Sequence, residues 1–150
     1  MVQWSQHILA IERFLMYSFI YWSAMKPITA SSTQLDPGEV LAKATIRASA
    51  LLGLTGSALG KIIGMSEASV SRLAKGERPL QPQTKEGELA TLLVRAYRSL
   101  DALVGNDEKR RLEWLNSYNQ GVNGTPKELI QSAQGLVRVV SYLDGMRAVI

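Results

Sequence analysis

The feature that most constrains the fold is a stretch at residues 54–76 in which two short apolar helical patterns are joined by a tight turn. Gly64 can take the left-handed conformation that ends the first helix and turns the chain sharply. Gly60, four residues earlier, leaves space for the second helix to approach closely. Met65 fills the corner, and Ser66 is a suitable N-cap for the second helix. The pattern therefore predicts a helix-turn-helix.

Apolar residues of this stretch are spaced to face inward, which leaves the polar side of the second helix facing solvent. The inward set is Leu59, Ile62, Ile63, Val70 and Leu73, and the outward set is Glu67, Ala68, Ser69 and Arg72. In helix-turn-helix motifs the N-terminal residues of the second helix enter the major groove of DNA, and an arginine one turn later can reach guanine O6 and N7. The candidate DNA-binding residues are therefore Ser66, Glu67, Ala68, Ser69, Arg72 and Lys75.

The distribution of charge agrees with a polyanionic partner. The chain has a formal net charge of +4 at pH 7, and residues 55–78 contribute four basic and two acidic side chains to it. Half of the net charge thus lies in about one sixth of the chain, which suits nucleic acid. A nucleotide phosphate loop is excluded here, because Thr55 stands where that motif needs glycine and Ile62 where it needs a metal-binding hydroxyl.

Composition excludes several other classes of protein. The chain has no cysteine and one histidine, His7, which excludes disulfide scaffolds, zinc fingers and thiolate or histidine catalysis. Hydrophobic residues at 46% and charged residues at 20% are typical of a folded protein. We expect a cytoplasmic protein without cofactor or metal. We also expect no enzymatic activity, because no His, Cys or metal-ligand cluster completes a site around Glu86 and Glu88.

The first 35 residues are expected to form an N-terminal extension and a linker. Residues 14–24 are an apolar, aromatic run that is too short to span a bilayer. The residues before it are barely basic and no cleavage site of small residues follows, which argues against a signal peptide. Two interpretations stay open: an extra amphipathic helix that docks on the body or on a partner, or a start assigned too far upstream, with Met25 as the true initiator. Residues 26–36 are rich in Pro, Ser and Thr, as linkers are.

Helical patterns flank the helix-turn-helix on both sides. The first begins at an Asp36 cap followed by Pro37 and ends at Gly53. Its expected inward residues are Val40, Leu41, Ala44, Ala48, Leu51 and Leu52. After a Pro-containing stretch at residues 77–84, a longer helix has apolar residues at a period of 3.6 and is stopped at residues 105–106. Its apolar residues are Leu89, Leu92, Leu93, Ala96, Tyr97, Leu100, Leu103 and Val104. No segment shows sustained period-two alternation, so we expect an all-α fold.

The last third of the chain is expected to form a small helical module. Residues 107–113 are a charge run typical of a solvated helix face, and Trp114 and Leu115 after it are core candidates. A loop rich in Asn and Gly, residues 119–124, precedes Thr125-Pro126-Lys127-Glu128, which has the pattern of a capping box with proline at the first helical position. Leu129, Ile130 and Ala133 are expected to face inward. Gly135 is expected to break this helix before a final one that carries Leu136, Val139, Val140, Leu143 and Met146 and ends near residues 144–145.

Both halves of this pattern resemble known families. Residues 54–76 resemble the helix-turn-helix of phage-repressor-like regulators of the Xre type, with Gly60 standing where the family usually has alanine. The later residues resemble the toxin-binding domain of the Xre/MbcA/ParS antitoxins, although residues 144–150 match less closely and Asn123 alters the usual Gly-x-Thr-Pro core. The residues that carry this second resemblance are Trp114-Leu115, Asn119, Gly124-Thr125-Pro126, Leu129-Ile130, Gly135 and Leu143. The resemblance implies a phage-repressor-like helical bundle over residues 36–104 and a toxin-binding domain over residues 105–150.

The function that the resemblance implies is that of an antitoxin. In that family the partner is usually a RES-domain toxin that consumes NAD, and the antitoxin blocks its active site and represses the shared operon. Because one helix-turn-helix covers only a half-site of DNA, a homodimer that binds an inverted-repeat operator is expected. The expected toxin-binding residues are Trp114, Asn119, Leu143, Asp144, Met146, Arg147 and Ile150.

The role of the tail and the function itself each have an alternative. A guanidinium near the chain end suits the polar groups of a NAD-consuming cleft, with Met146, Val149 and Ile150 filling apolar space around Arg147. The alternative for Arg147 is a place in the last helical turn, where the helix dipole favours a cation by about 0.3–1 kcal/mol. The alternative function is a one-component phage-type repressor whose C-terminal part dimerises or senses a small ligand.

Overall fold

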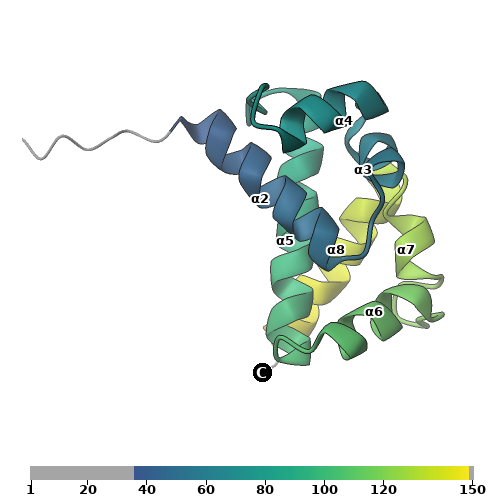
Figure 1. The fold of residues 1–150 in the computed structure, drawn as a ribbon. Coiled ribbons are helices and arrows are strands. Elements are labelled where there is room, and N and C mark those ends of the chain that lie inside the picture. Colours follow the sequence, from purple (N-terminus) through teal and green to yellow (C-terminus); the bar gives the residue numbers. More distant parts are fainter. Residues whose placement is uncertain (1–35, 149–150) are drawn as a thin grey trace, which may run out of the picture. The chain divides into compact units, whose positions relative to one another are not determined.

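A computed structural model describes residues 36–148, and within that range it contains seven helices and no strands. The all-α expectation is therefore confirmed. The helices are α2 (Pro37–Leu51), α3 (Gly56–Ile63), α4 (Glu67–Ala74), α5 (Lys85–Val104), α6 (Glu108–Asn116), α7 (Pro126–Leu129) and α8 (Ala133–Arg147) (Figure 1). The predictions for residues 14–24, for Met25 and for the linker lie outside the described residues. No helix among the described residues is long and apolar enough to cross a membrane.

Local capping residues define where the helices begin and end. Asp36 accepts a hydrogen bond from the Gly38 amide at the start of α2, and Thr84 accepts one from the Gly87 amide at the start of α5. Gly105 follows α5 with φ of 70°, in the left-handed region where glycine carries no Cβ penalty. These boundaries agree with the sequence pattern because each depends on residues within four positions of the helix end.

Helix α5 is the central element of residues 36–148. Both α2 and α8 pack along it, and α3 contacts it near the end where α4 lies (Figure 1). A single cluster of buried apolar side chains joins the two halves of the chain, since it includes Leu59 and Leu73 of the helix-turn-helix as well as Leu136 and Leu143 of α8. The HTH half and the C-terminal half therefore share one hydrophobic core.

The buried face of α2 differs from the expected one. Val40, expected to face inward, is 46% exposed, and the residues that α2 buries are Gly38, Ala42, Thr45, Ala48 and Ser49. The inward face is composed of small residues because α2 lies close to α5 and to residues 79–81, where a Cβ at Gly38 would come within 3.1 Å of the Pro79 side chain. The most hydrophobic positions of α2 are therefore not the most buried ones.

The charge run before Trp114 is not a fully solvated face. Arg111 is 1% exposed, and its guanidinium lies over the Tyr97 ring at 5.5 Å from the ring centre and 3.6 Å from Asp101 Oδ1. A buried arginine in such a run can only be recognised when its partner carboxylate is known. Here that carboxylate belongs to Asp101, which lies ten positions earlier on α5. Leu115 is buried, as expected, whereas Trp114 is only half-buried.

The helices α7 and α8 differ from the expected ones in four respects. Thr125 precedes α7 but its side chain makes no capping hydrogen bond, so the predicted capping box does not form. Gly135 lies inside α8 rather than between helices, and glycine is needed there because a Cβ would overlap the Leu129 carbonyl. The break falls instead at Ser132, whose hydroxyl accepts from the Gly135 amide at 3.1 Å. Ala133, expected inside, is exposed, and α8 continues to Arg147 rather than ending near residue 144.

Candidate functional site

The helix-turn-helix is built by two side-chain caps and one left-handed glycine. Thr55 caps α3 by accepting from the Ala58 amide at 3.1 Å, and Ser66 caps α4 by accepting from the Ser69 amide at 3.3 Å. Gly64 ends α3 with φ of 75°, as the turn requires. A Cβ at Gly60 would lie 2.5 Å from the Met65 carbonyl oxygen. Glycine therefore allows a tighter turn here than the alanine usual in the family that this stretch resembles.

The solvent-facing side of α4 contains most of the predicted DNA-binding residues. Glu67, Ala68, Arg72 and Lys75 are exposed, while Val70 and Leu73 are buried against the core. Ser66 is also exposed, although its hydroxyl is engaged in the cap. These side chains share one surface because α4 rises out of the turn with its apolar side inward.

Ser69 does not face outward as expected. It is 9% exposed, its hydroxyl accepts from Ser66 Oγ at 3.0 Å, and Arg78 Nη1 lies 3.4 Å from the same oxygen. The side chain therefore joins the start of α4 to the loop after it. Ser71, which is not among the predicted DNA-binding residues, is exposed two positions later and shares the outward side with Ala68 and Lys75. The helical period alone places Ser71 there, three residues after Ala68 and four before Lys75.

A basic groove lies beside α4. It has a volume of about 530 Å³ and runs between α2 and the end of α4 and the loop after it. Lys43 and Arg47 of α2 border it together with Lys75 and Arg78, and Glu39 is the one acidic residue among the described residues that line it. Its floor is apolar, with Ile46 and Leu73 among the lining residues. Cations from α2 and from the end of α4 thus lie next to the exposed side of α4.

The residues expected to contact a toxin fall into buried and exposed groups. Trp114 stacks on Tyr142 of α8, with ring centroids 6.4 Å apart. Asn119 stabilises the loop in which it lies. Its side chain accepts a hydrogen bond from the Gly121 amide at 2.8 Å, and its backbone pairs with that of Gly124. Leu143 is 1% exposed and belongs to the core, so its side chain is not available on the surface of the free chain.

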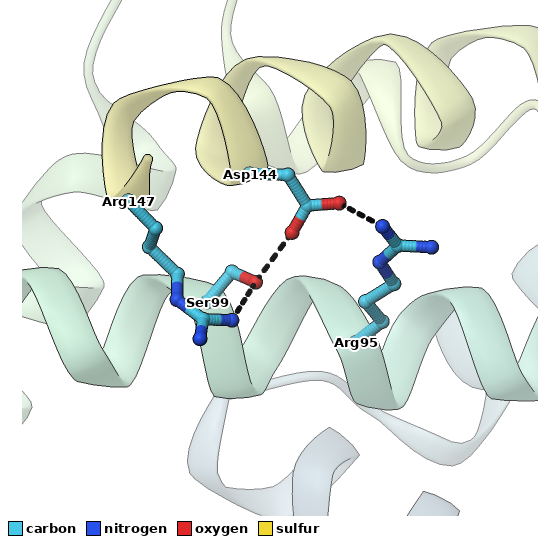
Figure 2. Close-up of polar contacts among 4 residues, drawn as sticks. All are labelled: Arg95, Ser99, Asp144 and Arg147. Atoms are coloured by element: carbon cyan, nitrogen blue, oxygen red, sulfur yellow. Dashed lines mark hydrogen bonds and ion pairs between the residues drawn. The ribbon is translucent and has the colours of Figure 1, made fainter. Parts of the chain in front are cut away.

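The exposed group lies at the end of α8. Met146 and Arg147 are exposed, and Asp144 is partly buried; Ile150 lies outside the described residues. Figure 2 shows how this end is held on α5: Arg95 Nη2 lies 2.6 Å from Asp144 Oδ2, and Ser99 donates to Asp144 Oδ1 at 2.8 Å. Arg147 Nη1 in turn donates to Ser99 Oγ at 3.2 Å. Arg147 therefore rests on a serine of α5 while the rest of its guanidinium stays open to solvent.

The helix-turn-helix half and the C-terminal half of the chain also contact each other at α3. Lys61 of α3 donates from Nζ to Gln131 Oε1, in the link between α7 and α8, at 3.0 Å. This exposed bond joins the first helix of the helix-turn-helix to the C-terminal half. No group of His, Cys, Asp or Glu side chains able to hold a metal ion is found among residues 36–148.

Comparison with protein families gives two matches that together cover most of the described chain. Residues 33–95 match a model described as the antitoxin Xre-like helix-turn-helix domain. Residues 99–148 match a model described as the antitoxin Xre/MbcA/ParS C-terminal toxin-binding domain. No curated protein matched the chain in a sequence comparison.

Proposed function

The chain is an antitoxin of the Xre/MbcA/ParS type, with a helix-turn-helix DNA-binding domain and a C-terminal toxin-binding domain and no enzymatic function, and we propose that its toxin is a NAD-consuming RES-domain protein. In this proposal the antitoxin occludes the toxin active site and represses the operon that encodes both proteins. The observation that carries it is the end of α8, where Met146 and Arg147 are exposed on the toxin-binding domain.

Arg147 is the polar anchor of this proposed inhibition. Its guanidinium holds five N–H donors, and among residues 36–148 only Nη1 is engaged, by the Ser99 hydroxyl. This bond is partly buried, and a hydrogen bond of this kind typically stabilises by about 0.5–1.5 kcal/mol, so contacts with a partner can outweigh its release. The pyrophosphate and ribose sites of a NAD-consuming cleft are lined by polar groups that a donor-rich cation can reach.

The proposal is tested by expressing the product of the neighbouring reading frame with and without the antitoxin. A RES-domain toxin alone should deplete cellular NAD and stop growth, and co-expression of the antitoxin should restore both. Growth arrest with an unchanged NAD pool would assign the toxin to another class. Absence of a neighbouring toxin gene would favour the alternative, a one-component repressor.

We expect Arg72 to read a base. The side chain is exposed on α4 one turn after Ala68, so it can extend into a major groove that α4 enters. Replacement of Arg72 by alanine should weaken binding to the specific operator by about 1–3 kcal/mol and to random duplex much less. Fluorescence anisotropy on both duplexes measures the difference. Lys75→Ala is the matched control: as a phosphate contact it should weaken both duplexes alike and reduce the salt slope. Equal loss on both duplexes in Arg72→Ala would make Arg72 a phosphate contact as well.

We further expect a homodimer on the operator. A single helix-turn-helix covers one half-site, so two readers related by a twofold axis should bind an inverted repeat whose half-site centres lie roughly 34 Å apart, one helical turn of DNA. Footprinting on operators with half a turn of DNA inserted between the half-sites tests the spacing. Undiminished protection of such operators, or of isolated half-sites, would contradict it.

A further inference from the structure

A hollow of about 390 Å³ lies along α5 beside the end of α8, away from the exposed side of α4. Its lining residues are Thr91, Val94, Arg95, Arg98, Ser99 and Arg147. Three of the six are arginines and two carry hydroxyl groups, and no acidic residue is among them. The volume falls within the usual range of small-molecule sites.

The positive charge of this hollow is only partly balanced by protein groups. Asp144 is the carboxylate next to it, and both of its oxygens are engaged, one by Arg95 and one by Ser99. Among residues 36–148, neither Arg98 nor Arg147 forms an ion pair. Within the described part of the chain, the hollow therefore presents two guanidinium groups that form no ion pair.

The arrangement of these groups is fixed by the packing of α8 on α5. Ser99 is fully buried, and its hydroxyl connects Asp144 to Arg147, as Figure 2 shows. Thr91, Arg95 and Arg98 follow one another at spacings of four and three residues, so they lie on one side of α5. The cation from α8 and the two cations from α5 thus border the same hollow.

We propose that this hollow binds the phosphate group of a small molecule. Guanidinium groups bind phosphate through paired, charge-assisted hydrogen bonds, and several of them around one site match a tetrahedral dianion with three free oxygens. A planar carboxylate is satisfied by a single bidentate arginine and leaves the others unbalanced. The site is separate from α4, and it does not depend on the identity of the toxin.

The test is a titration of the full chain with inorganic phosphate, in which backbone amide NMR signals are recorded at each step. Chloride is the compensating anion that keeps the ionic strength constant. Saturable shifts are expected at Ser99 and Arg147. Arg98→Gln and Arg147→Gln should each weaken the affinity about tenfold, the effect of one lost charge-assisted hydrogen bond. Arg138→Gln is the matched control, because Arg138 is exposed on the opposite face of α8 and should leave the affinity within about twofold.

A second titration uses random duplex DNA in place of inorganic phosphate. It distinguishes the phosphate of a small molecule from the phosphates of a DNA backbone. Shifts confined to α4 and its surroundings support the proposal. Shifts at Ser99 with duplex but not with inorganic phosphate would overturn it in favour of a DNA-backbone contact. It is also overturned if inorganic phosphate gives no saturation, or if Arg138→Gln weakens the affinity as much as Arg98→Gln, because the effect is then one of general charge.

Discussion

Replacement of Asp101 by alanine is expected to lower the free energy of unfolding by about 3–5 kcal/mol, the cost of leaving a buried charge without its partner. Arg111 is 1% exposed, and Asp101 Oδ1 is the carboxylate oxygen nearest to it, at 3.6 Å from Nη2. At that distance the two groups form an ion pair but no hydrogen bond. Nε and Nη1 of Arg111 also find no hydrogen-bond partner among residues 36–148. Without Asp101 the guanidinium retains only the face of Tyr97.

The reverse substitution, Arg111→Met, should cost far less. Methionine keeps the apolar stem that packs between α5 and α6, and the Asp101 side chain, at 28% exposure, can be hydrated. We expect a loss below about 1.5 kcal/mol. Urea unfolding followed by circular dichroism gives both values, provided that the slope with denaturant is unchanged.

The matched control for this pair is Arg110→Ala. Arg110 lies next to Arg111 on α6 and pairs with Asp107 at 3.5 Å, but its side chain is 73% exposed. An exposed pair of this kind contributes about 0–1 kcal/mol. A loss in Asp101→Ala no larger than that in Arg110→Ala would show that Arg111 is hydrated and that the pair has no particular role.

The sequence predicted those parts of the fold that depend on neighbouring residues. The caps at Asp36 and Ser66 and the left-handed glycines Gly64 and Gly105 are where the pattern places them, because each satisfies backbone groups within the same helix end. Without these caps and turns, backbone N–H and C=O groups at the helix ends would lack hydrogen-bond partners. Local rules were therefore sufficient for these helix ends and for the turn of the helix-turn-helix, but not for the cap at Thr125 or for the bounds of α8.

Features that depend on contacts between distant residues were not predictable. Gly135 was expected to end a helix, but its actual constraint is the Leu129 carbonyl against which α8 packs. The burial of Arg111 depends on Asp101 and Tyr97 of α5, and the burial of Ser69 on the loop that carries Arg78. A periodic pattern gives the phase of a helix only approximately, so one residue at the edge of its face is easily misassigned.

The same distinction applies to the candidate sites. The exposed side of α4 could be predicted because the period of one helix defines it. The exception is that Ser71 is exposed where Ser69 was expected to be. The support of Arg147 could not, since Ser99 lies 48 positions earlier. The sequence offered two places for Arg147, a toxin cleft or the last turn of α8. In the free chain it occupies that last turn, which leaves the toxin contact as a proposal.

Removal of the chain beyond Met146 is expected to abolish neutralisation of the toxin while operator binding persists. The deletion removes Arg147 and its neighbours but keeps Asp144 with its partners Arg95 and Ser99, so α8 should stay packed on α5. Loss of a hot-spot arginine should weaken the toxin complex by about 2 kcal/mol or more, roughly thirtyfold. Cells that co-express the toxin with this variant should stop growing, and anisotropy with operator DNA should be unchanged.

Point variants separate the charge of Arg147 from the length of the tail. Arg147→Glu should also restore growth arrest, but it places a carboxylate near Asp144 and can loosen the end of α8 by repulsion. Arg147→Gln avoids this repulsion and retains a donor for Ser99, so loss of neutralisation in both variants would assign the effect to the missing cation. Arg138→Glu makes the same charge change on the opposite face of α8 and should still protect. If the truncated chain and both Arg147 variants protect cells fully, the tail is not the inhibitory element. Neutralisation must then come from the surface between Trp114 and Ile130, where half-buried Trp114 and exposed Tyr118 offer aromatic contact area.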